Sequence, residues 1–174
     1  MLIKGIVDED FINYKLPSMY IATATCSFKC DKEYGQPICQ NSELVKQPTI
    51  DISIEDLVNR YIQNPITKAV VFGGLEPIDQ IEDIALFIGT LRFCYNDSIG
   101  KFYGGCDDPV IIYTGYTKEE TNKLIDVISS EYLGFQLDNI IIKYGRYIPN
   151  QQPHYDPVLG VYLASDNQYA ERIS

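Results

Sequence analysis

The chain has 174 residues and a formal net charge of −10, and 45% of its residues are hydrophobic and 22% charged. This much apolar material supports a single globular domain over residues 1–174 and excludes a disordered tail. The acidic balance argues against direct binding to nucleic acid or to an anionic membrane surface, because both reward clusters of Lys and Arg.

We expect no secretory signal in the N-terminal segment, because residues 8–10 turn acidic before a long apolar run develops. No stretch approaches the roughly 20 apolar residues that a membrane helix needs. We therefore expect a soluble protein of the cytoplasm. The five cysteines are an odd number, which argues against a fully paired disulfide framework and leaves thiols free for metal binding or catalysis.

Apolar β-rich runs alternate with amphipathic helical runs along the chain. A capping box at Ser53, followed by apolar residues at helical spacing, predicts the best-defined helix. In chain order, the pattern predicts a strand over 19–24, a helix over 53–64, a strand over 68–72, a turn over 73–77, a helix over 78–95, a strand over 109–114, a helix opening at Thr117, a strand over 139–143 and a last strand over 158–163.

Such alternation predicts an α/β fold with right-handed β–α–β units around a mostly parallel sheet. The units are too few for a complete eight-stranded barrel of ~250 residues, so we expect a partial, open β/α barrel. Ligands of these folds bind at the carboxyl ends of the strands. The loops at 26–41, 73–77 and 114–116 each follow a predicted strand, and all three should face one site.

The first of these loops places Cys26, Cys30 and Cys39 within fourteen residues, in the spacing C-x3-C-x8-C. Thiolates gathered this closely suit a soft metal. Three ligands leave one coordination position open, as in an iron–sulfur cluster with one non-cysteine iron ligand. The alternative is a structural zinc site, which usually takes four ligands in closely spaced pairs. Its fourth ligand would come from Cys94, Cys106 or His154.

A free cysteine is more often a small packing residue than a ligand, so Cys94 and Cys106 receive no role of their own. The single histidine, His154, excludes any site that needs two imidazoles. We therefore expect the cysteine loop to supply either all the protein ligands of the metal site or all but one of them.

The second loop, Gly73-Gly74-Leu75-Glu76-Pro77, leaves a buried strand. Its two glycines can bring backbone close to a ligand, and Glu76 adds a carboxylate, so the loop can receive an ammonium group. The same pattern is more often a simple turn before a helix, in which Glu76 would face the helix dipole. It is not a phosphate-binding P-loop, because no Gly-Lys-Ser/Thr follows.

Together the two loops resemble the radical S-adenosylmethionine (SAM) superfamily. There, three cysteines after the first strand hold a [4Fe-4S] cluster, and a Gly-Gly-Glu-Pro loop after the second strand binds the amino group of the cofactor's methionine. Cys26, Cys30 and Cys39 match the cysteines. Residues of the second loop match the other motif with Leu75 inserted: Gly73, Gly74, Glu76 and Pro77.

Within the superfamily, the chain resembles the small activating enzymes of anaerobic ribonucleotide reductase. The resemblance runs almost from end to end, with matching segments at 5–10, 16–18, Asn41, 113–117, 144–147 and 165–168. The spacing of the cysteines differs, since the family usually separates its second and third cysteines by two residues and this chain separates them by eight.

The resemblance implies a reaction in which S-adenosylmethionine is reductively cleaved to methionine and a 5′-deoxyadenosyl radical. The electron would come from a donor such as flavodoxin or ferredoxin. The radical would then remove a hydrogen from a glycine of a partner protein, most simply anaerobic ribonucleoside-triphosphate reductase. The cluster and cofactor carry the chemistry, so no further catalytic residue is expected.

The remaining site residues are implied by position. Glu76 would lie near the cofactor's amine, Thr114 would lie at the third loop near cofactor or partner, and Lys143 would reach the cofactor's carboxylate from a later strand. Two alternatives stay open at this point. One is a radical enzyme that acts on a small molecule or a peptide, and the other is a zinc-stabilised binding module without chemistry.

Overall fold

The computed structural model describes residues 1–93, 95–96, 101–102, 105–122 and 139–173. Within these ranges the main sheet has seven strands in the order β11-β8-β7-β4-β2-β1-β3. Its strands are β1 (Leu2–Asp10), β2 (Ser18–Thr23), β3 (Ile50–Asp51), β4 (Val70–Gly74), β7 (Val110–Tyr113), β8 (Ile140–Tyr144) and β11 (Tyr169–Arg172). Two smaller antiparallel pairs join β5 (Tyr95–Asn96) to β6 (Lys101–Phe102) and β9 (His154–Asp156) to β10 (Val161–Leu163).

The predicted helices are present where the structure describes them, and two short helices, Lys29–Tyr34 and Ser42–Lys46, were not predicted. The helices are α1 (Lys29–Tyr34), α2 (Ile54–Gln63), α3 (Ile81–Arg92), and the 3-10 helices η1 (Ser42–Lys46) and η2 (Pro77–Gln80), and residues 118–122 are also helical. The Ser53 hydroxyl accepts a hydrogen bond from the Asp56 amide at 3.0 Å, which confirms the predicted start of α2. The predicted helix over 78–95 consists of η2 followed by α3, and Cys94 lies outside the described residues.

Strands β2, β4, β7 and β8 form the parallel centre of the sheet and lie side by side in chain order. Antiparallel strands complete it, with β1 and β3 beyond β2 and β11 beyond β8. The fold is therefore mixed α/β with a mostly parallel sheet, as predicted. The sheet order is that of an open sheet with β3 and β11 at its edges.

The edge strands were not predicted, and the strand predicted over 158–163 is confirmed only in part, because it is shorter than expected and is not the last strand. Of the segment 158–163, only β10 is a strand, and it pairs with β9 rather than with the main sheet. The last strand of the sheet is β11, in which only Ala170 is buried. Edge strands are held by backbone pairing and bury few side chains, so their sequences carry little alternation.

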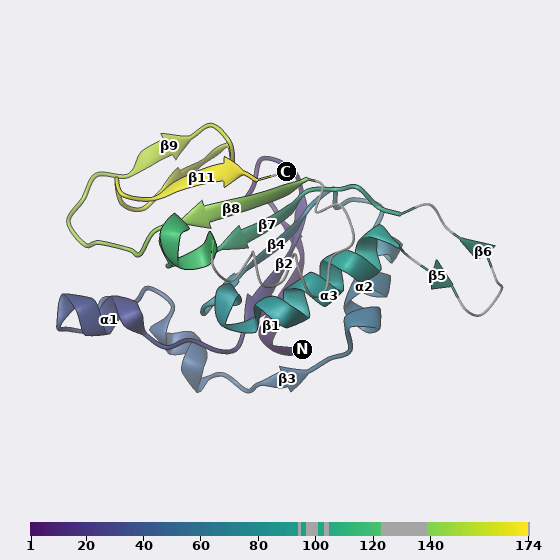
Figure 1. The fold of residues 1–174 in the computed structure, drawn as a ribbon, viewed down its shortest axis with the longest axis horizontal. Helices are drawn as coiled ribbons and strands as arrows, with labels where there is room; N and C mark the ends of the chain where they lie inside the picture. The colour runs from purple at the N-terminus through teal and green to yellow at the C-terminus, as the bar shows by residue number, and fades with distance from the viewer. Residues whose placement is uncertain (94, 97–100, 103–104, 123–138, 174) are drawn as a thin grey trace.

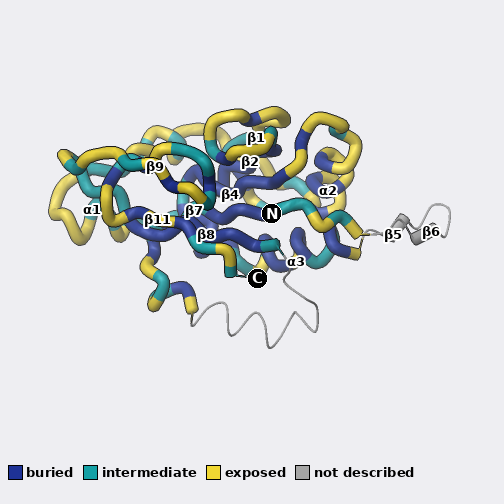
Figure 2. Tube along the Cα trace, turned by 90° about the horizontal axis from the view of Figure 1, so that it is seen from above, coloured by how far each residue is buried: buried dark blue, intermediate teal, exposed yellow. Residues whose placement is uncertain are grey.

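Both faces of the sheet are covered. One face packs against α2 and α3, which lie side by side in front of it in Figure 1, and its buried residues include Phe72, Ile112 and Ile142. The opposite face packs against Tyr14 and against Leu159 and Leu163 around the β9–β10 pair. Figure 2 shows the central strands buried along their length, whereas the segment around α1 is largely exposed.

The parallel centre places the carboxyl ends of four strands at one edge, the end toward which β4, β7 and β8 point in Figure 1. Segment α1 projects at this same end. Among the described residues, no helix has the length and apolar composition required to cross a lipid bilayer. A ligand site is therefore expected between the cysteine segment and these strand ends.

Candidate functional site at the carboxyl ends of the parallel strands

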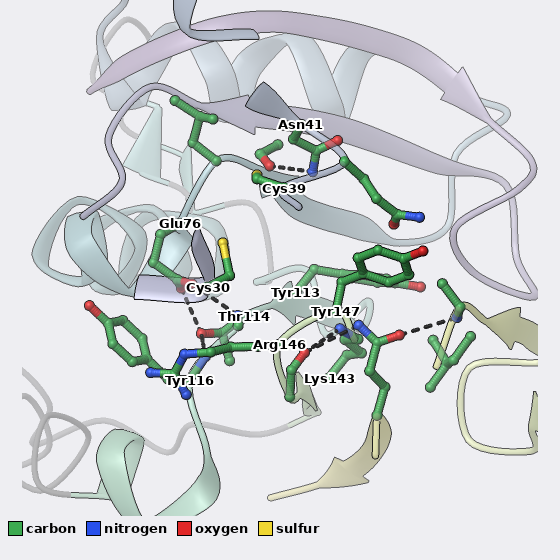
Figure 3. A pocket seen from close by; sticks show the side chains of 18 of the residues that line it. Cys30, Cys39, Asn41, Glu76, Tyr113, Thr114, Tyr116, Lys143, Arg146 and Tyr147 are labelled. Carbon is green, nitrogen blue, oxygen red and sulfur yellow. Dashed lines mark hydrogen bonds between the residues drawn. The ribbon is translucent and has the colours of Figure 1, made fainter. Parts of the chain in front are cut away.

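A pocket of about 340 Å³ lies at this end of the sheet, and the three predicted loops line it together. Figure 3 shows how its side chains converge from separate strands. Cys26, Cys30 and Cys39 come from the segment after β2, Gly74 and Glu76 follow β4, Thr114 follows β7, and Lys143 lies on β8. The structure thus confirms that the loops face one site.

Gly73 and Pro77 are not among the residues that line the pocket, and the local backbone accounts for their residue types. A Cβ atom at Gly73 would lie 2.6 Å from the Tyr20 hydroxyl. Gly74 has a φ of +85°, and a Cβ there would lie 2.8 Å from the Cα of Ala22. The two glycines are required because β4 approaches β2 closely and then turns with a left-handed residue. Pro77 is the first residue of η2, where its missing N–H costs nothing.

Asn41 ties the cysteine segment to the glycine loop. Its side-chain amide donates a hydrogen bond to the Gly74 carbonyl at 2.6 Å, shown as a dashed line in Figure 3. Alongside, the Glu76 amide donates to the Thr25 carbonyl at 2.8 Å. The sequence marked Asn41 through the family resemblance, but its bond to Gly74 joins residues 33 positions apart and could not be inferred from the pattern.

The Glu76 carboxylate is 7% exposed and joins the loops after β4 and β7. One oxygen accepts hydrogen bonds from the Thr114 hydroxyl at 2.6 Å and the Ile78 amide at 3.1 Å, and the other accepts from the Gly115 amide at 2.9 Å. Burial raises the pKa of Glu76, and these hydrogen bonds oppose that shift. A carboxylate offers about four acceptor positions, so one remains for a ligand in the pocket.

Both interpretations of Glu76 therefore have a structural basis. It caps the start of η2 through Ile78, as a helix-start carboxylate does, and it also lines the pocket. Thr114 lies at the third loop, as predicted. It lines the pocket, but its hydroxyl donates to Glu76, so its direct effect is to hold that carboxylate in place.

Lys143 is a buried cation in this pocket, with an exposure of 6%. Its ammonium group donates to the Gly145 carbonyl at 3.0 Å and lies 5.9 Å from the centre of the Tyr113 ring. Burial lowers the pKa of Lys143 to about 8, although the nearby Glu76 raises it. An ammonium has three donors, so this group retains capacity to bind an anion such as a carboxylate.

The three loop cysteines are free, partly exposed thiols. The Cys26 sulfur accepts a hydrogen bond from the Phe28 amide at 3.2 Å. Burial raises the pKa of Cys26 to about 11 and that of Cys30 to about 12, and in Cys30 the neighbouring Cys39 adds to the effect. Among the described residues, no three Cys, His, Asp or Glu side chains converge closely enough to hold a metal ion. The three thiols therefore line one pocket, but they are too far apart in this structure to bind one metal ion together.

Cys106 and His154 do not line this pocket. Cys106 packs beside the helical core, where its amide donates to the Leu91 carbonyl at 3.1 Å. His154 lies on β9. Two of the three residues considered as a fourth zinc ligand are therefore placed outside the pocket, and the third, Cys94, is among the residues that the structure does not describe.

Two carboxylates, those of Asp79 and Asp31, form hydrogen bonds that hold the cysteine segment, and the sequence did not predict these bonds. Asp79 accepts hydrogen bonds from the Tyr116 hydroxyl at 2.7 Å and from the Ser27 amide at 3.0 Å. Asp31 lies within the segment and accepts from the amides of Ile38 and Cys39, each at 2.9 Å. These hydrogen bonds fix the backbone next to Cys26, through the Ser27 amide, and the backbone at Cys39.

An ion-pair network joins α1 to Glu120 and Arg146, which follow β7 and β8. Arg146 lies 3.2 Å from Glu33 of α1 and 2.9 Å from Glu120, and Lys29 of α1 also reaches Glu120 at 3.2 Å. Lys29 and Arg146 both approach the ring of Tyr116. The hydrogen bond from Arg146 holds the pKa of Glu120 at about 2. These partners are far apart in sequence, and no local pattern indicated the network.

Comparison with known proteins gave no match to a family model, a curated protein or a solved structure. The resemblance to radical SAM enzymes therefore depends on the residues of the cysteine and glycine loops. To these residues the structure adds their common pocket, the acceptor position left on Glu76, and the buried ammonium of Lys143.

Proposed function

We propose that the chain is a radical SAM enzyme that generates a glycyl radical on a partner protein. Cys26, Cys30 and Cys39 would hold a [4Fe-4S] cluster, and S-adenosylmethionine would bind beside it. The observation that carries the proposal is the meeting of the cysteine segment, the glycine loop and Lys143 in one pocket at the carboxyl ends of parallel strands. When bound, the two groups would supply a one-electron cleavage of the cofactor and a hydrogen abstraction from a glycine Cα.

The donor set of the pocket fits such a cluster. Three free thiols from one segment line it, and thiolates are the ligands that iron–sulfur clusters take. Neither Cys106 nor His154 completes a four-ligand zinc site there. The thiols must approach one another more closely on loading than they do in the structure, which agrees with their position on an exposed segment.

The polar residues of the pocket suit the two charged groups of an amino acid. The remaining acceptor position of Glu76, with the adjacent backbone, would receive the ammonium group of the cofactor's methionine. The Lys143 ammonium would receive the carboxylate. Thr114 and Gly115 would act through Glu76, because their hydrogen bonds fix the direction in which its carboxylate points.

The size and rim of the pocket favour a protein substrate. A volume of about 340 Å³ is near the lower end of ordinary ligand pockets, so a cofactor leaves little enclosed space for a second small molecule. Ile12 and Tyr162 line the same pocket while being 76% and 73% exposed. An apolar, solvent-accessible rim suits a polypeptide segment that enters from outside.

The rest of the proposal follows from this assignment. The substrate would be a glycyl-radical protein, in the first place anaerobic ribonucleotide reductase, and the electron donor a cytoplasmic flavodoxin or ferredoxin. The fold would be a partial β/α barrel, which the order of the parallel strands and the shared face of α2 and α3 support.

Electron paramagnetic resonance tests the function directly. Anaerobically reconstituted and reduced protein is mixed with S-adenosylmethionine and the candidate reductase. We expect a glycyl-radical signal with the wild-type chain and with Cys106→Ala, whose cysteine lies outside the pocket, and no signal with Cys26→Ala. Cleavage of the cofactor without a glycyl radical would contradict the assigned substrate and favour a small molecule or another peptide. If a chain that holds its cluster does not cleave S-adenosylmethionine, the proposed enzymatic activity is refuted.

A further inference from the structure

The eight residues between Cys30 and Cys39 form a closed turn. Helix α1 contains Cys30 and is capped by Gly35, which has a φ of +76° and donates its amide to the Asp31 carbonyl at 2.9 Å. The chain then reverses, and the Ile38 and Cys39 amides both donate to one carboxylate oxygen of Asp31. The residue that follows Cys30 in sequence therefore binds the backbone of the last cysteine.

This closure decides where the third thiol lies. Nine residue steps in an extended chain span up to roughly 30 Å, so the sequence separation alone does not bring Cys39 near Cys30. In the structure, the Cys30 sulfur is 3.8 Å from the same Asp31 oxygen that accepts a hydrogen bond from the Cys39 amide. One carboxylate oxygen is thus the point at which both ends of the turn meet.

We propose that Asp31 is a positioning residue that sets the Cys39 thiol beside Cys30, so that the long spacing delivers a third ligand to the pocket. The purpose of this placement, ligation of a cluster, rests on the proposed function. The placement itself rests on the two amide hydrogen bonds. Asp31 acts through Cys39 and touches no reacting atom.

The test compares two substitutions that remove the same charge. Asp31→Asn keeps a side-chain oxygen that can accept from both amides, whereas Asp31→Ala removes it. Because Asp31 also raises the pKa of Cys30, a comparison of either variant with wild type alone would mix charge with placement. Comparison of Asp31→Asn with Asp31→Ala isolates the effect of the two hydrogen bonds from the Ile38 and Cys39 amides. Glu43→Ala, which removes an exposed carboxylate paired with Lys46, is the matched control.

The first readout needs no metal. Reduced, metal-free protein is treated with diamide, which takes two electrons and two protons from a pair of thiols as the disulfide forms, and the Cys30–Cys39 linkage is followed by peptide mass mapping. We expect Asp31→Asn and Glu43→Ala to form this linkage at least as fast as wild type. We expect Asp31→Ala to form it on the order of tenfold more slowly than Asp31→Asn, because the closed turn loses two hydrogen bonds. Equal rates in Asn and Ala would overturn the proposal.

Two further measurements make the result secure. In metal-free wild type, the Ile38 and Cys39 amides should be protected from hydrogen exchange, and full exposure would refute the closed turn even if Asp31→Ala does not fold. After anaerobic reconstitution, Asp31→Asn should retain more iron than Asp31→Ala, and equal iron contents would contradict the link to ligation. Failure of every chain, including wild type, to take up iron would refute the proposed function, while the disulfide rates would still decide the role of Asp31.

Discussion

Replacing Gly74 by alanine tests the turn that opens the site. Gly74 adopts a φ of +85°, which costs an L-residue with a side chain about 1–2 kcal/mol. The new Cβ would also lie 2.8 Å from the Cα and 2.9 Å from the Cβ of Ala22, and such overpacking against backbone costs about 1–3 kcal/mol. We therefore expect Gly74→Ala to lower the free energy of unfolding by about 2–5 kcal/mol, a large share of the roughly 5–15 kcal/mol of a typical domain.

Urea unfolding of the full chain under reducing conditions measures this loss. Gly5→Ala is the matched control, because Gly5 lies in β1 without a positive φ and a Cβ there meets nothing within 4 Å. It should change stability by no more than about 1 kcal/mol, and in the stabilising direction. A Gly74→Ala variant as stable as Gly5→Ala would show that the left-handed turn against β2 is not how the chain leaves β4.

Three further outcomes follow from other contacts. Ser53→Ala should lower the free energy of unfolding by about 1 kcal/mol in urea, because the Asp56 amide loses its cap, and no loss would contradict the capping. For Lys143, burial holds the pKa near 8, so the unfolded chain binds the extra proton between pH 8 and about 10.4, and the contribution of Lys143 to stability rises with pH across that window. Lys143→Met should remove this rise and relieve a penalty of about 3 kcal/mol at pH 7, as measured by unfolding at each pH, and parallel profiles of the two chains would refute it. Arg146→Ala should release α1 and speed tryptic cleavage at Lys29 and Lys32, whereas unchanged cleavage would show that the ion pairs do not hold the segment.

The centre of the fold followed from the sequence because its elements bury regular faces. Helix α2 combines a cap at Ser53 with apolar residues at helical spacing, and β4 and β8 are fully buried runs. The outer antiparallel strands β1 and β11 escaped prediction because their pairing is made by backbone atoms and leaves most side chains accessible.

The site was predicted as a meeting of loops but not as a set of contacts. Parallel topology dictates that loops after β2, β4 and β7 share an edge, and this part was confirmed. The bonds from Asn41 to Gly74 and from Arg146 to Glu120 join distant residues whose types carry no local signal. From the sequence, Gly73 and Gly74 were interpreted as glycines that let a ligand approach the backbone. In the structure, side chains at these two positions would collide with Tyr20 and Ala22 of β2.

The most direct test of the central claim is the metal content of anaerobically reconstituted protein, with iron, acid-labile sulfide and zinc measured together. We expect about four irons and four sulfides per wild-type chain, as a [4Fe-4S] cluster requires. The same content is expected in Cys106→Ala, and loss of the cluster is expected in Cys26→Ala, Cys30→Ala and Cys39→Ala. Stoichiometric zinc without iron in the wild-type chain, or a full cluster in a chain that lacks one of the three pocket cysteines, would contradict the proposed ligation.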